Sequence, residues 1–507
     1  MPEMPHLIIG TRGSDLALWQ AHHVHGLITA QGGTAEIKVL STQGDREQVQ
    51  SFEKLEGKGF FTKEIEDALL QGLIDVAVHS HKDLETTQPP GLVVAAVPHR
   101  ASARDVLLVR KDAETVAPWL PLRPGATVGT SSVRRRDQLL LLRPDVHIAA
   151  LRGNVPTRIE RLREGRYDAI ILAEAGLDRL ELNLEDLVRC PLQPQWFVPA
   201  PAQGALALQM REDDPRCSFI AALSAAEDLQ NVAAERTVLR GLEGGCQLPF
   251  GAHWDADSKK LRCFLQTKAG PRRCLSASAE EALRQLSATA TRTVLITRQP
   301  RPDSLLQRLS TSSGVALIEQ PLVAAAPIPS PAIPNWTSAP NWVWLGSPGA
   351  VKAAEQWIDE HPEVRLAVPG TGTAEALTDA MLNRLDHIGQ GHPNGAWSAF
   401  IDALTPSDRV AIPHSTASLK RWEEHPTSAT LYPWAHYQPA PTSIQPPTAD
   451  IVCFTSPSNV AAWTGPVPDK AVALGQATSA AMKARNWPHA TAKTPDAFGI
   501  LESILSC

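Results

Sequence analysis

The stretch Ala126-Thr-Val-Gly-Thr-Ser-Ser-Val-Arg-Arg-Arg-Asp-Gln-Leu-Leu-Leu-Leu142 has the pattern of a short strand followed by a helix. The strand ends at Gly129. Either Ser131 or Ser132 then provides the helix N-cap, and arginines occupy the first helical turn. A cation at a helix N-terminus is unfavourable by itself, because the helix dipole is already positive there. The pattern therefore predicts a bound anion at this helix start, with a solvated basic turn as the alternative.

The same alternation of strand and helix extends through the first half of the chain. It is typical of α/β sheets with helices on both faces, in which ligands bind beyond the carboxyl ends of the strands. The predicted strands cover residues 7–10, 36–40, 75–79, 93–97, 106–109, 126–129, 147–150 and 169–172. The predicted helices cover residues 16–28, 62–71, 133–142 and 155–164.

A second strand end carries a carboxylate. The segment Leu73-Ile-Asp-Val-Ala-Val-His-Ser-His-Lys-Asp83 begins as a buried strand and ends in a polar cluster. Asp83, flanked by Lys82, is well placed for proton transfer or for stabilising a cation in a cleft. A surface loop with a charge pair is the alternative.

Cations follow two further strands. Arg152 follows the strand at residues 147–150, and Arg158 lies in the first turn of the next helix. Arg12 and Ser14 follow the first strand in the same way. Because four strand ends carry a cation or a helix cap, we expect a single cleft that binds an anionic ligand.

Two glycine-containing loops are further candidates. The loop at residues 54–61, Lys-Leu-Glu-Gly-Lys-Gly-Phe-Phe, has the composition of a mobile lid over an anionic, partly apolar ligand. An ordinary flexible loop is equally compatible with it. In Glu243-Gly-Gly-Cys-Gln-Leu-Pro249 the paired glycines would let another group approach the sulfur of Cys246. A buried, inert cysteine is the usual alternative.

Composition and charge limit the class of protein. At 507 residues two to four domains are expected, and a net charge of −6 with local arginine clusters favours small anions over nucleic acid. No apolar run approaches the roughly 18–20 residues of a membrane span, and we see no export signal. The 7 cysteines lack metal-ligand spacing, so a reducing cytosol and no metal site are expected. The histidines at positions 22, 23 and 25 are better explained as helix surface than as a metal site.

The composition changes near residue 291. Nine of the 13 tryptophans lie beyond Pro334, and the proline-rich residues 321–340 indicate a linker or a long loop. Residues 217–289 before this point have the pattern of a small α+β domain. Beyond it, strand-like runs at residues 293–297, 342–345, 366–369, 409–413, 451–455 and 472–475 predict a separate α/β module.

The motifs of the first half, taken in order, resemble those of porphobilinogen deaminase, also called hydroxymethylbilane synthase. They are Gly10-Thr-Arg-Gly-Ser-Asp-Leu-Ala-Leu-Trp-Gln20, Val78-His-Ser-His-Lys-Asp83, Gly129-Thr-Ser-Ser-Val-Arg-Arg135, Leu151-Arg-Gly-Asn-Val-Pro-Thr-Arg158, Ala202-Gln-Gly-Ala-Leu206 and Glu243-Gly-Gly-Cys-Gln-Leu-Pro249. The resemblance implies two periplasmic-binding-protein-like lobes, made of residues 1–98 with 196–216 and of residues 99–195. The small α+β domain would carry the cofactor cysteine, and a monomer is favoured.

The resemblance also implies a chemistry. Dipyrromethane would be joined by a thioether to Cys246, and four porphobilinogen units would be added head to tail with loss of ammonia. Asp83, with Lys82, would assist loss of the amino group and stabilise the azafulvenium and pyrrole N–H groups. Residues implied to hold acetate and propionate groups are Arg12, Ser14, Lys82, Thr130, Ser132, Arg134, Arg135, Arg152, Arg158 and Arg179. Lys54, Lys58 and Phe61 would form the lid, and Gln203 would lie on the hinge side of the cleft.

Two positions depart from the family pattern. His81 stands where an apolar residue is expected before Lys82. Pro156 stands where glycine is frequent, and it removes one N–H donor while remaining compatible with a first helical turn. We expect a tuned site that still works.

The module from residues 291 to 507 resembles uroporphyrinogen-III synthase, through Val294-Leu-Ile-Thr-Arg298, Ile451-Val-Cys-Phe-Thr-Ser-Pro-Ser458 and Val472-Ala-Leu-Gly-Gln-Ala-Thr478. Two α/β lobes joined by strands would follow. The candidate residues are Tyr432, which would be catalytic, and Ser456, Ser458 and Thr478. Trp344-Leu-Gly-Ser-Pro-Gly349 departs from the usual threonine-serine pattern, so an inactive structural module is the alternative. For the whole chain, the alternative is a two-lobed anion receptor without catalysis.

Overall fold

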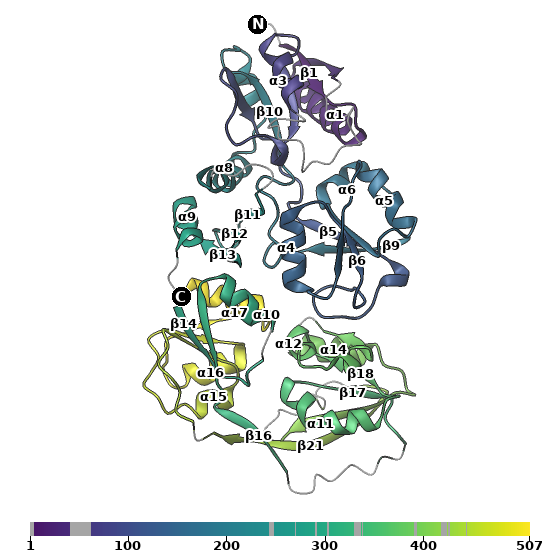
Figure 1. The fold of residues 1–507 in the computed structure, drawn as a ribbon, viewed down its shortest axis with the longest axis vertical. Helices are drawn as coiled ribbons and strands as arrows, with labels where there is room; N and C mark the ends of the chain where they lie inside the picture. Colours follow the sequence, from purple (N-terminus) through teal and green to yellow (C-terminus); the bar gives the residue numbers. More distant parts are fainter. Residues whose placement is uncertain are drawn as a thin grey trace. The chain divides into compact units, whose positions relative to one another are not determined.

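The computed structural model describes most of the chain. Its description omits residues 1–4, 41–61, 243–247, 269, 289–291, 302–303, 329–335, 337, 390–392, 417–422, 424–425 and 443. The predicted lid residues Lys54, Lys58 and Phe61, as well as Cys246, therefore lie outside the described residues. The chain forms two compact units (Figure 1). The first comprises residues 1–113, 124–140 and 144–288, and the second comprises residues 114–123, 141–143 and 289–507.

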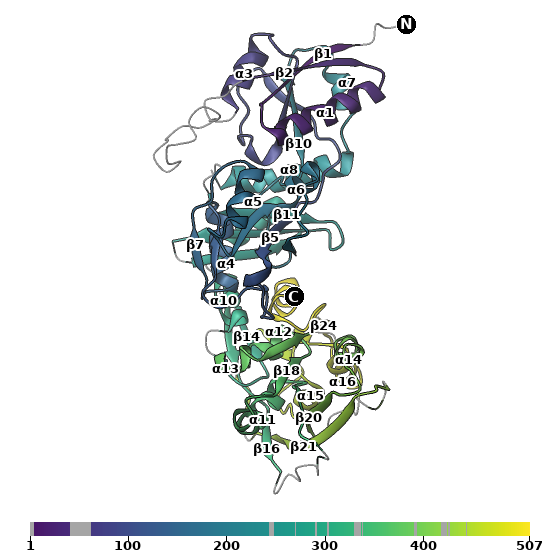
Figure 2. The ribbon, with the colours of Figure 1, turned by 90° about the vertical axis from the view of Figure 1, so that its right-hand side faces the viewer.

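The first unit begins with a five-stranded sheet in the order β2-β1-β3-β10-β4. Its strands are β1 His6–Thr11, β2 Thr34–Val39, β3 Val76–Ser80, β4 Leu92–Ala96 and β10 Leu206–Arg211. Helices α1 (Asp15–Ala30) and α7 (Cys217–Ala221) cover one face, and α3 (Lys63–Leu70) covers the other (Figure 2). Because both faces are covered, β3 and β10 are buried along almost their whole length.

A second sheet of the first unit repeats this arrangement, with the order β7-β6-β8-β5-β9. Its strands are β5 Asp105–Arg110, β6 Thr127–Gly129, β7 His147–Ala149, β8 Ala169–Ala173 and β9 Leu187–Leu192. Helix α4 (Val133–Leu142) lies on one side, with α5 (Val155–Arg163) and α6 (Glu174–Leu180) on the other (Figure 1). In each sheet three parallel strands are followed by one antiparallel strand, β10 or β5.

The two antiparallel strands connect the lobes. The chain leaves the first sheet after β4, enters the second through β5 and returns through β10. Two lobes linked by two crossings are typical of periplasmic binding proteins, and the predicted fold class is confirmed for this half. The exact domain bounds remain a prediction.

The small α+β part of the first unit follows. Helix α8 (Ala226–Gly241) precedes the antiparallel sheet β11-β12-β13, and α9 (Ala279–Ser287) packs on it. The strands are β11 Phe250–Asp255, β12 Lys260–Thr267 and β13 Gly270–Ser276. Helix α8 ends just before the segment that contains Cys246.

The second unit contains two sheets. The parallel sheet β15-β14-β22-β23-β24 consists of β14 Arg292–Ile296, β15 Val315–Glu319, β22 Ile451–Phe454, β23 Ala471–Ala473 and β24 Ala490–Thr491. The sheet β16-β21-β20-β17-β18-β19 consists of β16 Val323–Pro327, β17 Trp342–Trp344, β18 Arg365–Val368, β19 Leu385–Ile388, β20 Arg409–Ser415 and β21 Thr430–Pro441. Strands β16 and β21 carry the chain from one lobe to the other and back, which confirms two lobes joined by strands.

Helices cover both sheets of the second unit. The helices are α10 Leu305–Ser312, α11 Pro348–Glu360, α12 Thr371–Ala374, α13 Asp379–Leu382, α14 Pro393–Asp402, α15 Pro457–Ala461, α16 Gln476–Lys483 and α17 Ala497–Ser506. Val116, from the segment at residues 114–123, packs against the core formed by α11 and strands β17 and β18.

The prediction of a linker or long loop at residues 321–340 was wrong for β16. This short alanine-rich edge strand tolerates flanking prolines because only one of its sides is paired.

Candidate active site

Asp83 ends a short turn that follows the buried strand β3. Residues His81–Asp83 form a 3₁₀ turn, in which His81 is buried, Lys82 is half-buried and Asp83 is exposed. The backbone N–H of His81 donates to the carbonyl of Ala205 (3.0 Å), which ties the turn to the start of β10. The structure therefore presents Asp83 beyond a strand end, as the sequence predicted.

Lys82 lies close to charged groups of the other lobe. Burial lowers the pKa of Lys82, and the nearby guanidinium groups of Arg134 and Arg135 lower it further. The carboxylates of Asp83 and Asp105 act in the opposite direction. Lys82 therefore experiences the charges of Asp105 on β5 and of two arginines at the start of α4.

Arg134 and Arg135 share one buried carboxylate. Arg134 donates to Asp105 Oδ2 (2.7 Å), and Arg135 donates from Nε and Nη2 to Asp105 Oδ1 (2.9 and 2.7 Å). Their other contacts are backbone carbonyls of Val198 and Ile171. Both guanidinium groups strongly lower the pKa of Asp105. The sequence did not predict this partner. In the sequence, the only indication of its role is that Asp105, a charged residue, directly precedes the apolar strand predicted at residues 106–109.

Asp105→Ala should destabilise the first unit strongly. The substitution leaves two buried arginines without their carboxylate, and breaking a buried ion pair in this way costs about 3–5 kcal/mol. Asp186→Ala is the matched control, because Asp186 also accepts two hydrogen bonds from one guanidinium group, that of Arg163, but is 51% exposed. The control should change the free energy of unfolding by less than about 1 kcal/mol in urea unfolding. Equal effects of the two substitutions would contradict the prediction.

Arg158 and Arg152 lie at the start of α5. Asn154 caps this helix by accepting from the N–H of Thr157 (3.0 Å), and Arg158 Nε donates to the carbonyl of Gly153 (2.7 Å). Burial lowers the pKa of Arg158 to about 10, with a further lowering by Arg135 and an opposing effect of Asp83. Arg158 therefore experiences the charges of both Arg135 and Asp83, and its role in binding a ligand stays a prediction. Arg152 is half-buried, and its carbonyl accepts from Arg161 (2.7 Å).

Arg179 and Gln203 are buried beside the lobe crossings. Arg179 donates to the carbonyl of Gly204 (2.8 Å) and lies over the ring of Trp19 (5.5 Å to its centroid). Gln203 donates to the carbonyl of Ala103 (2.7 Å) and to Asp105 (3.1 Å). Within the described part of the chain, Arg179 Nε and Gln203 Oε1 have no hydrogen-bond partner. Buried polar atoms are normally paired, so these two atoms are available as a donor and an acceptor for a ligand.

The remaining predicted residues of this half lie at the same strand ends. Arg12 and Ser14 are half-buried after β1, and Ser14 is the N-cap residue of α1. Thr130 is buried, and its Oγ1 accepts from the N–H of Ser132 (3.2 Å). Ser132 Oγ in turn accepts from the N–H of Arg135 (3.4 Å).

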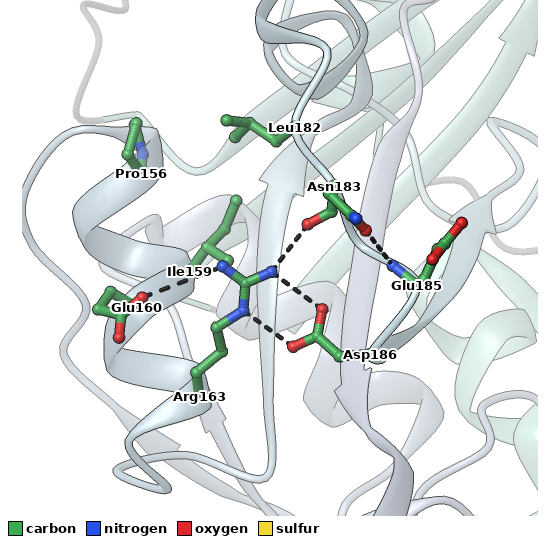
Figure 3. A pocket seen from close by; sticks show the side chains of 8 residues that line it. All are labelled: Pro156, Ile159, Glu160, Arg163, Leu182, Asn183, Glu185 and Asp186. Atoms are coloured by element: carbon green, nitrogen blue, oxygen red, sulfur yellow. Dashed lines mark hydrogen bonds and ion pairs between the residues drawn. The ribbon is translucent and has the colours of Figure 1, made fainter.

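A pocket of about 510 Å³ lies elsewhere, between α5 and the loop after α6 (Figure 3). Arg163 is the arginine that lines this pocket. Its guanidinium group donates to the carboxylate of Asp186 and to the carbonyl of Asn183 (2.8 Å). Pro156 lines it, but none of the predicted ligand-binding residues does. Because its arginine is already paired, this pocket is a poor site for a carboxylate ligand.

In the second unit the predicted polar residues lie on helices α15 and α16, which pack against each other, and on strand β21. Ser456 caps α15 through Asn459, Ser458 is half-buried in that helix, and Thr478 is buried in α16. Tyr432 lies on β21, and its ring packs near that of Trp336 (6.1 Å between centroids). These assignments stay predictions.

A second tyrosine of β21 was missed by the sequence reasoning. The hydroxyl of Tyr437 lies 3.2 Å from Ser347 Oγ, and Ser347 caps α11. Burial raises the pKa of Tyr437. Ser347 belongs to the segment that departs from the family pattern, so a hydroxyl pair is present at that place.

Comparison with known proteins identifies the first unit. Residues 7–218 match the family model for the dipyromethane cofactor binding domain of porphobilinogen deaminase, and residues 229–285 match the C-terminal domain of that enzyme. Porphobilinogen deaminase of Sulfurimonas denitrificans is 45% identical over 254 residues, covering 49% of this chain and 79% of that protein. The chain belongs to the porphobilinogen deaminase family. The deaminase of Nitratidesulfovibrio vulgaris is 47% identical over 255 residues, with the same coverage, 49% and 79%.

This deaminase carries a second module. Residues 304–502 match the model for uroporphyrinogen-III synthase HemD, which supports the predicted fusion. A crystal structure of uroporphyrinogen-III synthetase from Helicobacter pylori aligns with a TM-score of 0.30 and 14% identity, covering 42% of this chain and 99% of that one. No helix among the described residues is long and apolar enough to cross a membrane. The described residues also contain no cluster of three potential metal ligands.

The deaminase residues fit the dipyrromethane cofactor that the matching family model names. This cofactor is rich in carboxylates, and Arg158 and Lys82 are cations beside Asp83. The unpaired Nε of Arg179 and Oε1 of Gln203 are a buried donor and a buried acceptor suited to a ligand with carboxylate and N–H groups. The cysteine expected to carry the cofactor lies outside the described residues.

Proposed function

We propose that the chain is a hydroxymethylbilane synthase, a transferase that joins four porphobilinogen units head to tail with loss of ammonia. The observation that carries this proposal is the match of residues 7–218 and 229–285 to the porphobilinogen deaminase models, in a structure that presents Asp83 beyond β3 and Arg158 in the first turns of α5. We infer a monomer in the cytoplasm that acts on a small molecule. The six cysteines of the described residues are free, as is usual in a reducing compartment.

The residues of the β3 turn supply the proposed chemistry. Dipyrromethane, when bound, supplies the pyrrole carbon to which the first substrate unit is joined. The carboxylate of Asp83 accepts a hydrogen bond from the pyrrole N–H of the substrate. It also stabilises the positive charge that develops as ammonia leaves. Lys82, with a pKa lowered by burial, donates a proton to the leaving amine more readily than an exposed lysine would.

The arginines bind and orient the substrate. Each porphobilinogen unit carries two carboxylates, and bidentate guanidinium groups suit them better than ammonium groups. Arg152 and Arg158 lie at a helix start, where the positive end of the helix dipole adds to the attraction. Arg134 and Arg135 are already bound to Asp105, so we assign them mainly to fixing the α4 helix start beside Lys82.

The second module is proposed to close the linear product to uroporphyrinogen III. Two lobes joined by β16 and β21 and the match over residues 304–502 support this activity. The alternative, a structural module without activity, draws support from the departure at residues 344–349. Tyr437 beside Ser347 is a further candidate next to Tyr432.

Incubation of the purified full-length chain with porphobilinogen tests both activities. The type III isomer of uroporphyrinogen is expected as the product, because both modules act. The type I isomer would show that only the first module is active. Tyr437→Phe and Tyr432→Phe form a matched pair, and the variant that shifts the product to type I identifies the tyrosine that acts. Porphobilinogen that is bound but not consumed would contradict the proposal and favour an anion receptor.

A further inference from the structure

Arg236 of helix α8 binds the backbone of the turn that carries Asp83. Its Nη1 donates to the carbonyls of His81 (3.0 Å) and Leu84 (3.2 Å), and its Nη2 donates to the carbonyl of Glu85 (2.5 Å). Arg236 is only 7% exposed. One guanidinium group therefore holds three carbonyls from the two ends of a five-residue turn.

The carboxylate of Asp83 depends on this backbone for its position. The side chain is exposed, and no hydrogen bond reaches it from the part of the chain that the structure describes. The N–H of His81 donates to the carbonyl of Ala205 and so fixes the start of the turn. Arg236 fixes its end through the carbonyls of Leu84 and Glu85, which follow Asp83. A shift of about 1 Å in a reacting group costs about 10²-fold in rate, so a small movement of this turn would matter.

Helix α8 is anchored independently of Arg236. Glu235 binds Arg100 in a bidentate pair (2.8 and 3.0 Å) and accepts from the N–H groups of Ala202 (2.7 Å) and Trp254 (2.9 Å). Glu235 is fully buried, so these bonds fix the helix against the lobe crossings and the small sheet. Arg236 then has a rigid base from which to hold the turn.

We propose that Arg236 is a positioning residue for the deaminase reaction, which fixes the turn of Asp83 to the helix that leads into the Cys246 segment. The guanidinium fork acts through the backbone of residues 81–85 and does not touch the substrate. Helix α8 ends at Gly241, five residues before Cys246 in the sequence, so Arg236 ties the turn of Asp83 to the helix that directly precedes the proposed attachment segment in the chain. This role rests on the proposed function of the chain.

Arg236→Lys tests the role, with Arg240→Lys as the matched control. Lysine keeps the charge but lacks the planar fork that reaches three carbonyls. We expect kcat per adduct-bearing molecule, counted by intact mass, to fall about 10–100-fold with KM changed less than about threefold. Arg240 is an exposed arginine one turn further along α8, and its variant should match the unchanged protein.

Hydrogen exchange separates positioning from simple loss of fold. Amides in the peptide covering residues 80–86 should exchange at least about threefold faster in Arg236→Lys, while the peptide of the buried strand β5 stays unchanged. Unchanged kcat and unchanged exchange would overturn the proposal. A loss that disappears when rates are normalised to folded, adduct-bearing molecules would also overturn it, in favour of a purely structural role.

The two readouts also keep this inference apart from the proposed function. If the unchanged protein fails to consume porphobilinogen, the function is wrong, whatever the exchange data show. If it consumes porphobilinogen and Arg236→Lys behaves like Arg240→Lys, only the positioning role fails.

Discussion

Cys246→Ser should produce a protein that carries no covalent pyrrole adduct and forms no detectable product from porphobilinogen. A thioether needs a sulfur nucleophile, and a serine hydroxyl is far less nucleophilic at neutral pH. The loss should be complete, because every later step requires the tethered cofactor. Intact mass spectrometry of the purified protein measures the adduct directly, and the mass should equal that of the bare chain.

The control for this substitution is another free cysteine. Cys190 is half-buried in β9, and burial raises the pKa of its thiol, which makes it a poor nucleophile. Cys190→Ser should retain both adduct and turnover. An adduct that persists in Cys246→Ser, or disappears in Cys190→Ser, would place the attachment elsewhere.

Local patterns predicted much of the first unit. The helix at residues 133–142 and the strand at residues 75–79 appear as α4 and β3 because their signals, an N-cap followed by a helix and an unbroken apolar run, are short-range. Strand β21 shows the limit of such signals. Its prolines at positions 433, 439 and 441 argue against a strand, yet pairing with β20 and β16 forms one of 12 residues.

The site was predictable where its residues follow strands and unpredictable where they pair across the chain. Lys82 and Asp83 follow β3 and Arg158 lies on the helix after β7, and the ends of parallel strands are where a ligand site of such a sheet is expected. Asp105 could not be predicted, because its partners Arg134 and Arg135 lie 29 and 30 residues away. The sequence therefore indicated two arginines free for a ligand, while the structure gives them a buried carboxylate. Arg236 escaped notice for the same reason, since its contacts with the β3 turn span 151 to 155 residues.

Asp83→Asn should lower turnover of porphobilinogen by about 10³-fold or more while leaving the adduct in place. Asparagine has nearly the same shape and can still accept one hydrogen bond, but it carries no negative charge to stabilise the cation that forms as ammonia leaves. The turn at residues 81–85 should keep its geometry, because it contributes only its own backbone atoms to its hydrogen bonds with Ala205 and Arg236.

Glu85→Gln is the control that isolates the charge at position 83. Glu85 lies two residues further along the chain and is half-buried, and only its backbone carbonyl binds Arg236. Glu85→Gln therefore removes one carboxylate, as Asp83→Asn does, and leaves the turn intact. Its kcat should stay within about twofold of the unchanged protein, since a solvent-screened charge outside the site contributes little. Single-turnover rates and intact mass measured on both variants decide the matter. Near-normal turnover in Asp83→Asn would remove this carboxylate from the reaction, and loss of its adduct would instead assign Asp83 to cofactor assembly.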